Sequence, residues 1–372
     1  MRVLTIGSDP SIFVAGSAAR ERMRSYAATI GELHILSPAK RGTREEHEGN
    51  LYLHPIRAGK LFRVHSLARR ARALIRTHDI EIVSAQDPFE HGLAARRAVR
   101  GTHAKLHIQV HTDFLSPWFV KSGWRMSFLN RIRRNIASRV LPAADGIRAV
   151  SERVKASLIA RYGARIPEPS VIPIAVDSTV PEPVPLPMHS FAFALITIGR
   201  LEPEKRIGDI LKALKLVTTR YPMIGLFIVG DGRERRRLER TVRSLKLEKH
   251  VVFLGAHSDA RALLGSAQTF IQASAYEGYG RTLIEAALAK VPIITTDVGI
   301  VGDVLKHNEE VLVAPIARPK ALARCIETYI EDNTLRQGLP VRAELAVRAH
   351  LAAAGSSPER IRADLERAFR HP

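Results

Sequence analysis

The residues with the clearest chemical potential lie at positions 277–285, where the chain reads EGYGRTLIE. They follow an apolar run, Thr269–Gln272, that predicts a buried strand. The glycines allow a ligand to approach the backbone, and a helix predicted to begin near Arg281 directs free N–H groups at an anion. Glu277 and Glu285 flank that position, where carboxylates accept hydrogen bonds from sugar hydroxyls. The pattern predicts a site for a nucleotide diphosphate sugar; a glycine-rich turn with surface glutamates is the alternative.

A second segment supplies positive charge at positions 199–206, where the sequence is GRLEPEKR. It directly follows the apolar run Ala194–Ile198, which predicts another strand. Arg200 and Lys205 are therefore expected at the carboxyl end of a parallel sheet, where α/β proteins bind ligands. A guanidinium fork and an ammonium group both suit a diphosphate. Taken alone, the pair also fits a solvated turn.

The rest of the chain predicts the elements that position these segments. Short apolar runs alternate with longer amphipathic stretches from end to end, which indicates parallel sheets covered by helices. The predicted strands are Val3–Gly7, Leu33–Ser37, Ile82–Ala85, Leu106–His111, Gly146–Val150, Ser170–Ile174, Ala194–Gly199, Gly225–Gly230, His250–Leu254, Thr269–Gln272, Pro292–Thr295 and Glu310–Ala314. The predicted helices include Ser66–Thr77, Gly92–Arg100, Arg131–Leu141, Arg206–Thr219 and Arg233–Leu247.

Longer blocks of the sequence resemble glycosyltransferase family 4, the retaining group with the GT-B fold. The similarity covers nearly the whole chain, and the two glutamates stand in the family's register after the GRL block. The matching blocks are GRLEPEKR (199–206), VGDGRERRRLE (229–239), VVFLGAHSD (251–259), SAYEGYGRTLIEAALAKVPIITTDVG (274–299), AVSERVKASL (149–158) and VIPIAVD (171–177).

The resemblance implies an α/β GT-B fold, with two Rossmann-like doubly wound domains that face each other across a cleft. Residues 1–177 are expected to form the N-terminal Rossmann-like acceptor-side domain, and residues 191–355 the C-terminal nucleotide-sugar donor domain. Between them, residues 178–190 form a Pro-rich linker, with four prolines in PEPVPLP. Residues 356–372 are expected to form a helix capped by Ser357, which either ends the second domain or crosses back to the first.

The resemblance also assigns roles at the donor site. Arg200 and Lys205 are expected to hold the diphosphate, Glu285 the ribose and Glu277 a hydroxyl of the donor sugar. His111, after the strand in the first half, is expected to face that sugar. Residues 254–257 are expected beside the base. The complete expected donor-binding set is Gly16, Gly199, Arg200, Lys205, Gly255, Glu277, Gly278, Tyr279, Gly280, Arg281, Thr282 and Glu285, and the catalytic set is His111, Arg200, Lys205 and Glu277.

Three positions depart from the family's pattern. The loop after the first strand, residues 9–18, carries only Gly16 where the family often has paired glycines. The turn Pro173–Asp177 lacks the usual Asn-Gly, and Asp303 stands where Glu is common. The first departure bears on acceptor contacts, and none bears on the expected diphosphate or ribose contacts.

The resemblance implies transfer with retention, and the residues suggest how. No D-x-D triplet that would hold a metal is present, and no side chain is an obvious covalent nucleophile. We therefore expect no metal and no cofactor. The acceptor hydroxyl is expected to attack on the face that the diphosphate leaves, with cations stabilising the leaving group.

The net charge of the chain and one aromatic, basic segment indicate a second interaction surface. The chain carries a formal net charge of +20, which attracts polyanions and phosphorylated molecules unless the charges only solvate helix faces. Aromatic and basic residues are interleaved in residues 113–141, as in helices that lie on anionic membranes. The alternative is a core helix with a solvated basic face. The candidates for membrane contact are Trp118, Trp124, Lys121, Arg125, Arg131, Arg133 and Arg134.

The remaining features limit location and partners. A single cysteine, Cys325, excludes an internal disulfide framework. No signal peptide or membrane span is predicted, so we expect a cytoplasmic protein, with a peripheral position on the inner face of the plasma membrane left open. The expected partners are a UDP- or GDP-sugar and a glycan or lipid-linked acceptor, as in surface polysaccharide or glycolipid synthesis. A nucleotide-sugar 2-epimerase and a basic nucleic-acid-binding protein are the alternatives, although no nucleic-acid-binding signature is present.

Overall fold

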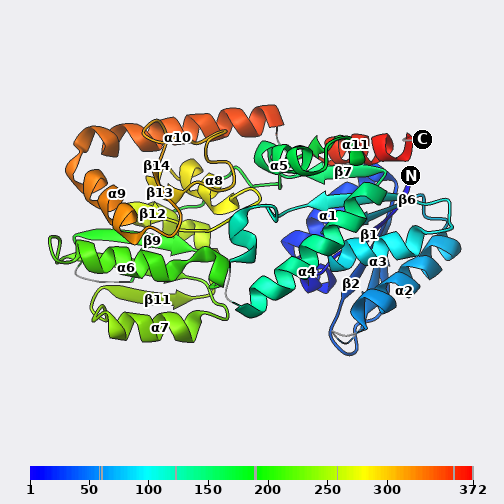
Figure 1. Ribbon diagram of the computed structural model, residues 1–372, viewed down its shortest axis with the longest axis horizontal. Coiled ribbons are helices and arrows are strands. Elements are labelled where there is room, and N and C mark those ends of the chain that lie inside the picture. The colour runs from blue at the N-terminus through cyan, green and yellow to red at the C-terminus, as the bar shows by residue number, and fades with distance from the viewer. Residues whose placement is uncertain are drawn as a thin grey trace. The chain divides into compact units, whose positions relative to one another are not determined.

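The computed structural model describes residues 1–57, 59, 62–121, 124–187, 191–257, 259–354 and 357–370. The chain divides into two compact units. The N-terminal unit comprises Met1–Pro173 and Ser356–Pro372, and the C-terminal unit comprises Ile174–Gly355. Each unit is a sheet covered by helices (Figure 1).

The sheet of the N-terminal unit is parallel except at one edge, where β3 runs antiparallel to β4. Its order is β3-β4-β2-β1-β5-β6-β7-β8. The strands are β1 (Arg2–Ile6), β2 (Glu32–Pro38), β3 (Glu46–Glu48), β4 (Leu51–Ile56), β5 (Ile82–Ala85), β6 (Lys105–Val110), β7 (Gly146–Ala149) and β8 (Ser170–Val171).

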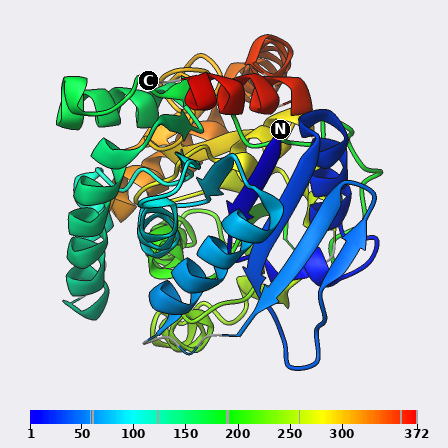
Figure 2. The ribbon, with the colours of Figure 1, turned by 90° about the vertical axis from the view of Figure 1, so that its right-hand side faces the viewer.

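Helices cover both faces of this sheet (Figure 2). One face packs against α1 and α11, which lie side by side although they come from opposite ends of the chain. On the other face, α2 packs beside α3. The α-helices are α1 (Ala18–Ile30), α2 (Arg63–His78), α3 (Glu90–Val99), α4 (Trp124–Val140), α5 (Glu152–Tyr162) and α11 (Pro358–Arg370).

The sheet of the C-terminal unit is parallel throughout, with the order β11-β10-β9-β12-β13-β14. The strand order reverses between β9 and β12, and such a switch point is where doubly wound sheets bind ligands. The strands are β9 (Phe193–Ile198), β10 (Ile224–Val229), β11 (Val251–Gly255), β12 (Thr269–Ile271), β13 (Ile293–Thr296) and β14 (Leu312–Ala314).

A continuous apolar core joins this sheet to its helices. Ile210 and Leu214 of one helix and Leu322 and Ile326 of another are buried against the strands. The α-helices are α6 (Ile207–Val217), α7 (Arg235–Ser244), α8 (Arg281–Leu288), α9 (Pro319–Glu331) and α10 (Asn333–Ala354).

The alternation of strands and helices agrees with the sequence, except that two strands at one edge of the first sheet, β3 and β4, were not predicted. Pro55 lies within β4, and proline is disfavoured in a strand interior. The tail helix is capped as expected, since the amide of Arg360 donates to Oγ of Ser357 (3.3 Å). That helix packs in the N-terminal unit, against α1, β6 and β7.

Candidate functional site

The two segments that the sequence singled out are neighbours in the C-terminal unit. The loop Gly199–Arg206 follows β9, and the loop before Gly280 follows β12, the adjacent strand. Since both strands are parallel, both loops leave the same edge of the sheet. The amide of Ala275 donates a hydrogen bond to the carbonyl of Glu204 (2.8 Å), which ties the loops together directly.

An ion pair joins the same two loops. Nζ of Lys205 lies 2.6 Å from Oε1 of Glu277, and both side chains are about four-fifths buried. Oγ of Ser274 also donates to Oε1 of Glu277 (2.7 Å). The Arg200 side chain is 76% exposed and lies 3.5 Å from Glu204. The structure therefore brings Lys205 and Glu277 into contact and leaves the Arg200 side chain exposed.

Helix α8 begins at the end of the second loop. Its N-cap, Gly280, has φ +84° and no side chain to cap the helix, so the first N–H groups of α8 are available to a ligand. The carbonyl of Tyr279 packs against Gly299, where a Cβ would lie 2.4 Å from that oxygen. The start of α8 is thus fixed by close backbone packing.

Tyr279 contributes only its backbone to this edge. Its ring is 1% exposed, and its hydroxyl lies 3.1 Å from Nε2 of His350. Burial raises the pKa of the Tyr279 phenol, so the hydroxyl stays protonated.

Side chains of α8 lie beside this start. Nε of Arg281 donates to Oε1 of Glu285 (2.8 Å), and only 9% of the Glu285 side chain is exposed. Burial raises the pKa of Glu285, and Arg281 opposes that rise. The Thr282 hydroxyl donates to Oε1 of Gln272 (2.8 Å), while Nε2 of Gln272 is buried without a hydrogen-bond partner.

The expected glycines occupy strand ends and loops. Gly199 follows β9, Gly278 is buried in the loop before α8, and Gly255 closes β11. The carbonyl of Gly255 accepts from the amide of Gly230 (2.6 Å). Gly16 lies in the N-terminal unit, just before Ser17 caps α1.

The other expected catalytic residue, His111, lies in the N-terminal unit directly after β6. Alternate residues of a strand share a face, so His107 and Gln109 lie on the same side of the sheet. A chain of hydrogen bonds runs from there to α11. Its links are His111 Nε2 to Gln109 Oε1 (2.9 Å), Gln109 Nε2 to Ser84 Oγ (2.9 Å), Ser84 Oγ to His107 Nδ1 (2.8 Å) and His107 Nε2 to Asp364 Oδ2 (3.0 Å).

The carboxylate at one end gives this chain a direction. Asp364 can only accept when it is ionised, so Nε2 of His107 carries the hydrogen and Nδ1 accepts from Ser84. The Ser84 oxygen then accepts from the amide of Gln109, which turns Oε1 of Gln109 toward His111. Nε2 of His111 must therefore donate, and Nδ1 is the acceptor nitrogen of that ring.

Two effects support this arrangement. Burial acts to raise the pKa of Asp364, but the opposing contacts, first among them the hydrogen bond from His107, lower it. Burial, followed by the positive charge of Arg148, lowers the pKa of His111 to about 3, against the opposing charge of Asp87. His111 is thus neutral at physiological pH. Arg148 also donates to Oε1 of Gln109 (3.3 Å).

Of this chain, only His111 is predicted from the sequence. Ser84, His107, Gln109 and Asp364 each occur in segments that had been assigned only to strands or to the tail helix. A signal was present, because KLHIQVH at residues 105–111 alternates four polar with three apolar side chains and so places the polar ones on one face of the strand.

The aromatic and basic segment combines core and surface residues. Phe114 and Phe119 are buried with Phe89, their ring centroids 5.5 and 5.9 Å from it. In contrast, Phe128, Leu129 and Ile132 of α4 are exposed. The side chains of Trp124 and Arg125 lie outside the described residues.

The basic members of this segment differ in their partners. Nζ of Lys121 lies 5.1 Å from the centre of the Trp118 ring. Arg133 pairs with Glu90 (3.0 Å), Arg134 donates to a backbone carbonyl, and Arg131 is exposed. Within the described residues, no helix combines the length and the apolar character that crossing a bilayer requires.

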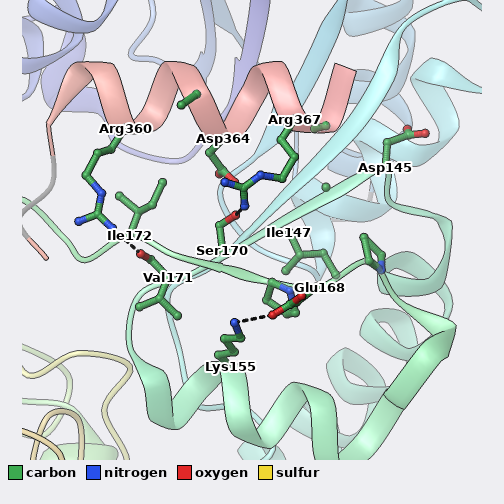
Figure 3. A pocket seen from close by; sticks show the side chains of 15 residues that line it. Asp145, Ile147, Lys155, Glu168, Ser170, Val171, Ile172, Arg360, Asp364 and Arg367 are labelled. Atoms are coloured by element: carbon green, nitrogen blue, oxygen red, sulfur yellow. Dashed lines mark hydrogen bonds and ion pairs between the residues drawn. The ribbon is translucent and has the colours of Figure 1, made fainter. Parts of the chain in front are cut away.

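A cavity of about 700 Å³ opens in the N-terminal unit between α5, β7, β8 and α11. Its charged side chains largely pair with neighbours, as Lys155 does with Glu168 (2.9 Å) and Arg367 with Oγ of Ser170 (2.6 Å) (Figure 3). Asp364 lines it as well. None of the expected site residues lines it, so this cavity is separate from the donor loops and meets the His111 chain only at Asp364.

Two family models match the chain. Residues 18–180 match the model described as Glycosyltransferase Family 4, and residues 192–344 match that described as Glycosyl transferases group 1. The chain therefore belongs to the family 4 glycosyltransferases.

Solved structures agree on the fold, which is of the GT-B type. Sucrose-phosphate synthase from Thermosynechococcus elongatus matches with a TM-score of 0.78 and 18% identity, over 100% of this chain and 98% of that one. HepE of Anabaena, solved in complex with UDP and glucose, matches with a TM-score of 0.73 and 19% identity, over 98% and 99%.

Curated relatives match over shorter stretches. Glycogen synthase of Mycobacterium tuberculosis is 26% identical over 219 residues, which cover 58% of this chain and 53% of that protein. Among the first relatives the matched stretch spans from 26% to 53% of the relative's own length.

Proposed function

We propose that the protein is a retaining glycosyltransferase that transfers a sugar from a UDP- or GDP-sugar to a hydroxyl of a glycan or lipid-linked acceptor. The observation that carries the proposal is the contact between the loops after β9 and β12, through Lys205 and Glu277 (2.6 Å), beside the uncapped start of α8. That contact places a cation, a carboxylate and free N–H groups on adjacent loops. HepE binds UDP-glucose within a similar fold, which also supports the proposal.

The donor's diphosphate would be bound from two sides. The N–H groups of Arg281 and Thr282 at the start of α8 face an anion, and Lys205 and Arg200 supply positive charge. Glu277, which accepts a hydrogen bond from Ser274, would accept another from the donor sugar. Glu285 is placed one turn into α8 for the ribose diol, if its pairing with Arg281 opens.

The reaction would break the bond between the anomeric carbon and a phosphate oxygen. The acceptor hydroxyl forms the new bond on the same face, and its proton passes to the departing diphosphate. Negative charge grows on the phosphate as the bond breaks, so fixed cations and N–H groups stabilise the transition state more than the bound donor. This scheme needs neither a metal nor a cofactor.

His111 would hold the donor sugar from the N-terminal unit as a neutral hydrogen-bonding group. The chain from Asp364 through His107 and Gln109 would keep Nε2 of His111 as a donor and Nδ1 as an acceptor. Asp364 is in this scheme a positioning residue, because it acts on His111 only through other side chains.

A peripheral membrane position would suit a lipid-linked acceptor. Phe128, Leu129 and Ile132 expose apolar surface on α4 beside the exposed Arg131, a combination that favours an anionic bilayer. Sedimentation with vesicles tests this. Phe128→Ser with Ile132→Ser is expected to weaken binding to anionic vesicles, whereas Leu345→Ser, which removes a similarly exposed side chain of α10, should not. Equal, negligible binding by all three proteins would reject the membrane surface.

A panel of UDP-, GDP- and ADP-sugars tests the function itself. We expect one sugar nucleotide to raise the melting temperature of the wild type and to raise it much less in Lys205→Met. Product analysis by NMR should then show the donor's anomeric configuration retained. A product with the inverted anomer would reject the mechanism, and the absence of binding to any sugar nucleotide would reject the function.

A further inference from the structure

Three histidines meet on the face of the N-terminal sheet that α2 covers. His34 comes from β2, His54 from β4, and His78 is the last residue of α2. One nitrogen from each ring can be chosen so that all three atoms lie within 4.8 Å of one another. His34 and His54 are buried, and His78 is half-buried. The proposed transfer reaction uses none of them.

The two buried rings face each other directly. Nδ1 of His34 lies 2.9 Å from Nε2 of His54. Their outer nitrogens face carboxylates: Nε2 of His34 lies 2.7 Å from Glu32, and Nδ1 of His54 lies 3.4 Å from Glu45. Each histidine therefore has one nitrogen directed inward and one directed at an acidic side chain.

Counting protons shows that the two rings cannot satisfy all these contacts by themselves. A neutral imidazole carries one hydrogen, so the two rings together supply two. The contact with Glu32, the contact between the rings and the contact with Glu45 together require three hydrogens. Nδ1 of His54 is the nitrogen that remains without a hydrogen bond, because it is buried and its contact with Glu45 does not have hydrogen-bond geometry.

We propose that His34, His54 and His78 form a binding site for a zinc ion. Nδ1 of His34 and Nε2 of His54 would each give a lone pair to the metal, His78 would supply the third nitrogen, and water the fourth ligand. The hydrogen on His54 would then move to Nδ1 and face Glu45. Two hydrogens now satisfy both carboxylates, and the two inward nitrogens have a common partner.

The rings would adjust around the ion, since the three nitrogens lie within 4.8 Å of one another and not at one common spacing. Two nitrogens bound to one tetrahedral zinc ion at about 2.0–2.1 Å lie roughly 3.3 Å apart. His34 and His54 would therefore separate by about 0.4 Å. Carboxylates that hold the outer N–H of metal-binding histidines orient the ligands and strengthen binding, and Glu32 and Glu45 already occupy those places. His78, at the exposed end of its helix, gives the ion a route of entry.

The ion would have a structural effect, because it joins β2, β4 and the end of α2. A metal that binds only the folded chain stabilises it in proportion to its affinity and concentration. This expectation concerns the edge of the N-terminal sheet and is independent of donor binding.

Metal binding to the full-length protein tests the proposal. After treatment with a chelator, wild type is expected to bind one Zn²⁺ per chain in a competition titration and to gain melting temperature. His78→Ala is expected to lose about 100-fold in affinity. His47→Ala is the matched control, because His47 is an exposed histidine that packs on Tyr52 beside the cluster (5.3 Å between ring centres), and it should bind zinc like the wild type.

Two further measurements keep the test decisive if His78→Ala folds poorly. Glu32→Gln should weaken zinc binding by about 10–100-fold through His34. Co²⁺ should give the intense visible absorption of a four-coordinate site in the wild type and in His47→Ala. Zinc binding that is equal in wild type, His78→Ala and Glu32→Gln, or a wild type that binds no zinc at micromolar concentration, would overturn the proposal.

Discussion

The donor loops of the C-terminal unit and the His111 chain of the N-terminal unit hold their polar groups by opposite means. In the donor loops, Lys205 and Glu277 form an ion pair at 2.6 Å. At His111, neutral groups pass hydrogen bonds to one buried carboxylate, Asp364. The charged groups of the Lys205–Glu277 pair can form new contacts with an incoming diphosphate. The hydrogen-bond chain that ends at Asp364 can only fix the orientation of His111. Changes of charge should therefore dominate at the first region, and changes of geometry at the second.

Lys205→Met should produce the largest loss. The substitution keeps much of the side-chain length but removes the cation expected at the leaving diphosphate, so kcat should fall by about 10²–10³-fold. Steady-state kinetics at saturating donor measure this. Lys212→Met removes an exposed lysine of α6 and should leave kcat unchanged; a matching loss in that control would mean that net charge, not position, is responsible.

Gly299→Ala tests whether the start of α8 must be held in place. A Cβ there would lie 2.4 Å from the carbonyl of Tyr279, at φ +61°. A shift of the helix start by about 1 Å can cost about 10²-fold in kcat/KM. Gly101→Ala is the control for backbone strain, because Gly101 has φ +73° and open space around it. If both variants lose the same activity, crowding at Tyr279 is not the cause.

Asp364→Asn tests the chain that orients His111. An amide can donate to His107 as well as accept from it, so the direction of the chain is no longer fixed. We expect kcat to fall by about 10-fold with little change in the KM for donor.

The same substitution in a His111→Ala background should cost nothing more, because interacting residues show non-additive effects. Glu366→Gln, which alters a carboxylate on the same helix that pairs with Arg362 (2.8 Å), should have no effect. If the losses of activity caused by Asp364→Asn and His111→Ala add fully in the double variant, Asp364 does not act through His111.

Local patterns in the sequence predicted more of the donor loops than of the His111 chain. Glu277, Gly280 and Lys205 lie in short segments that directly follow predicted strands, so spacing alone placed them at one edge of a sheet. Asp364 and His107 are 257 positions apart, and only the packing of α11 on β6 brings them together. No local pattern predicts such a contact.

Two other features escaped the sequence analysis for different reasons. β4 was missed because Pro55 disfavours a strand interior, yet β4 has only the short β3 as its outer neighbour near the sheet edge, where proline is tolerated. The pairing of Lys205 with Glu277 was not foreseen either, because both had been assigned only to a ligand. In a site without its ligand, charged side chains pair with one another. The spacing of residues in the sequence does not show which of them will pair.

The smallest effect concerns the stability of the free protein. Burial raises the pKa of Glu285, so above that pKa its ionised carboxylate opposes folding, and the penalty disappears as pH falls and the group becomes protonated. Glu285→Gln should therefore raise the melting temperature slightly at pH 7.5, and the difference from wild type should shrink toward acid pH. The same variant should bind the nucleotide more weakly, because the amide pairs less well with a ribose diol. A variant that is less stable at every pH would show instead that the contact with Arg281 outweighs burial, and the charged carboxylate would then stabilise α8 before any ligand arrives.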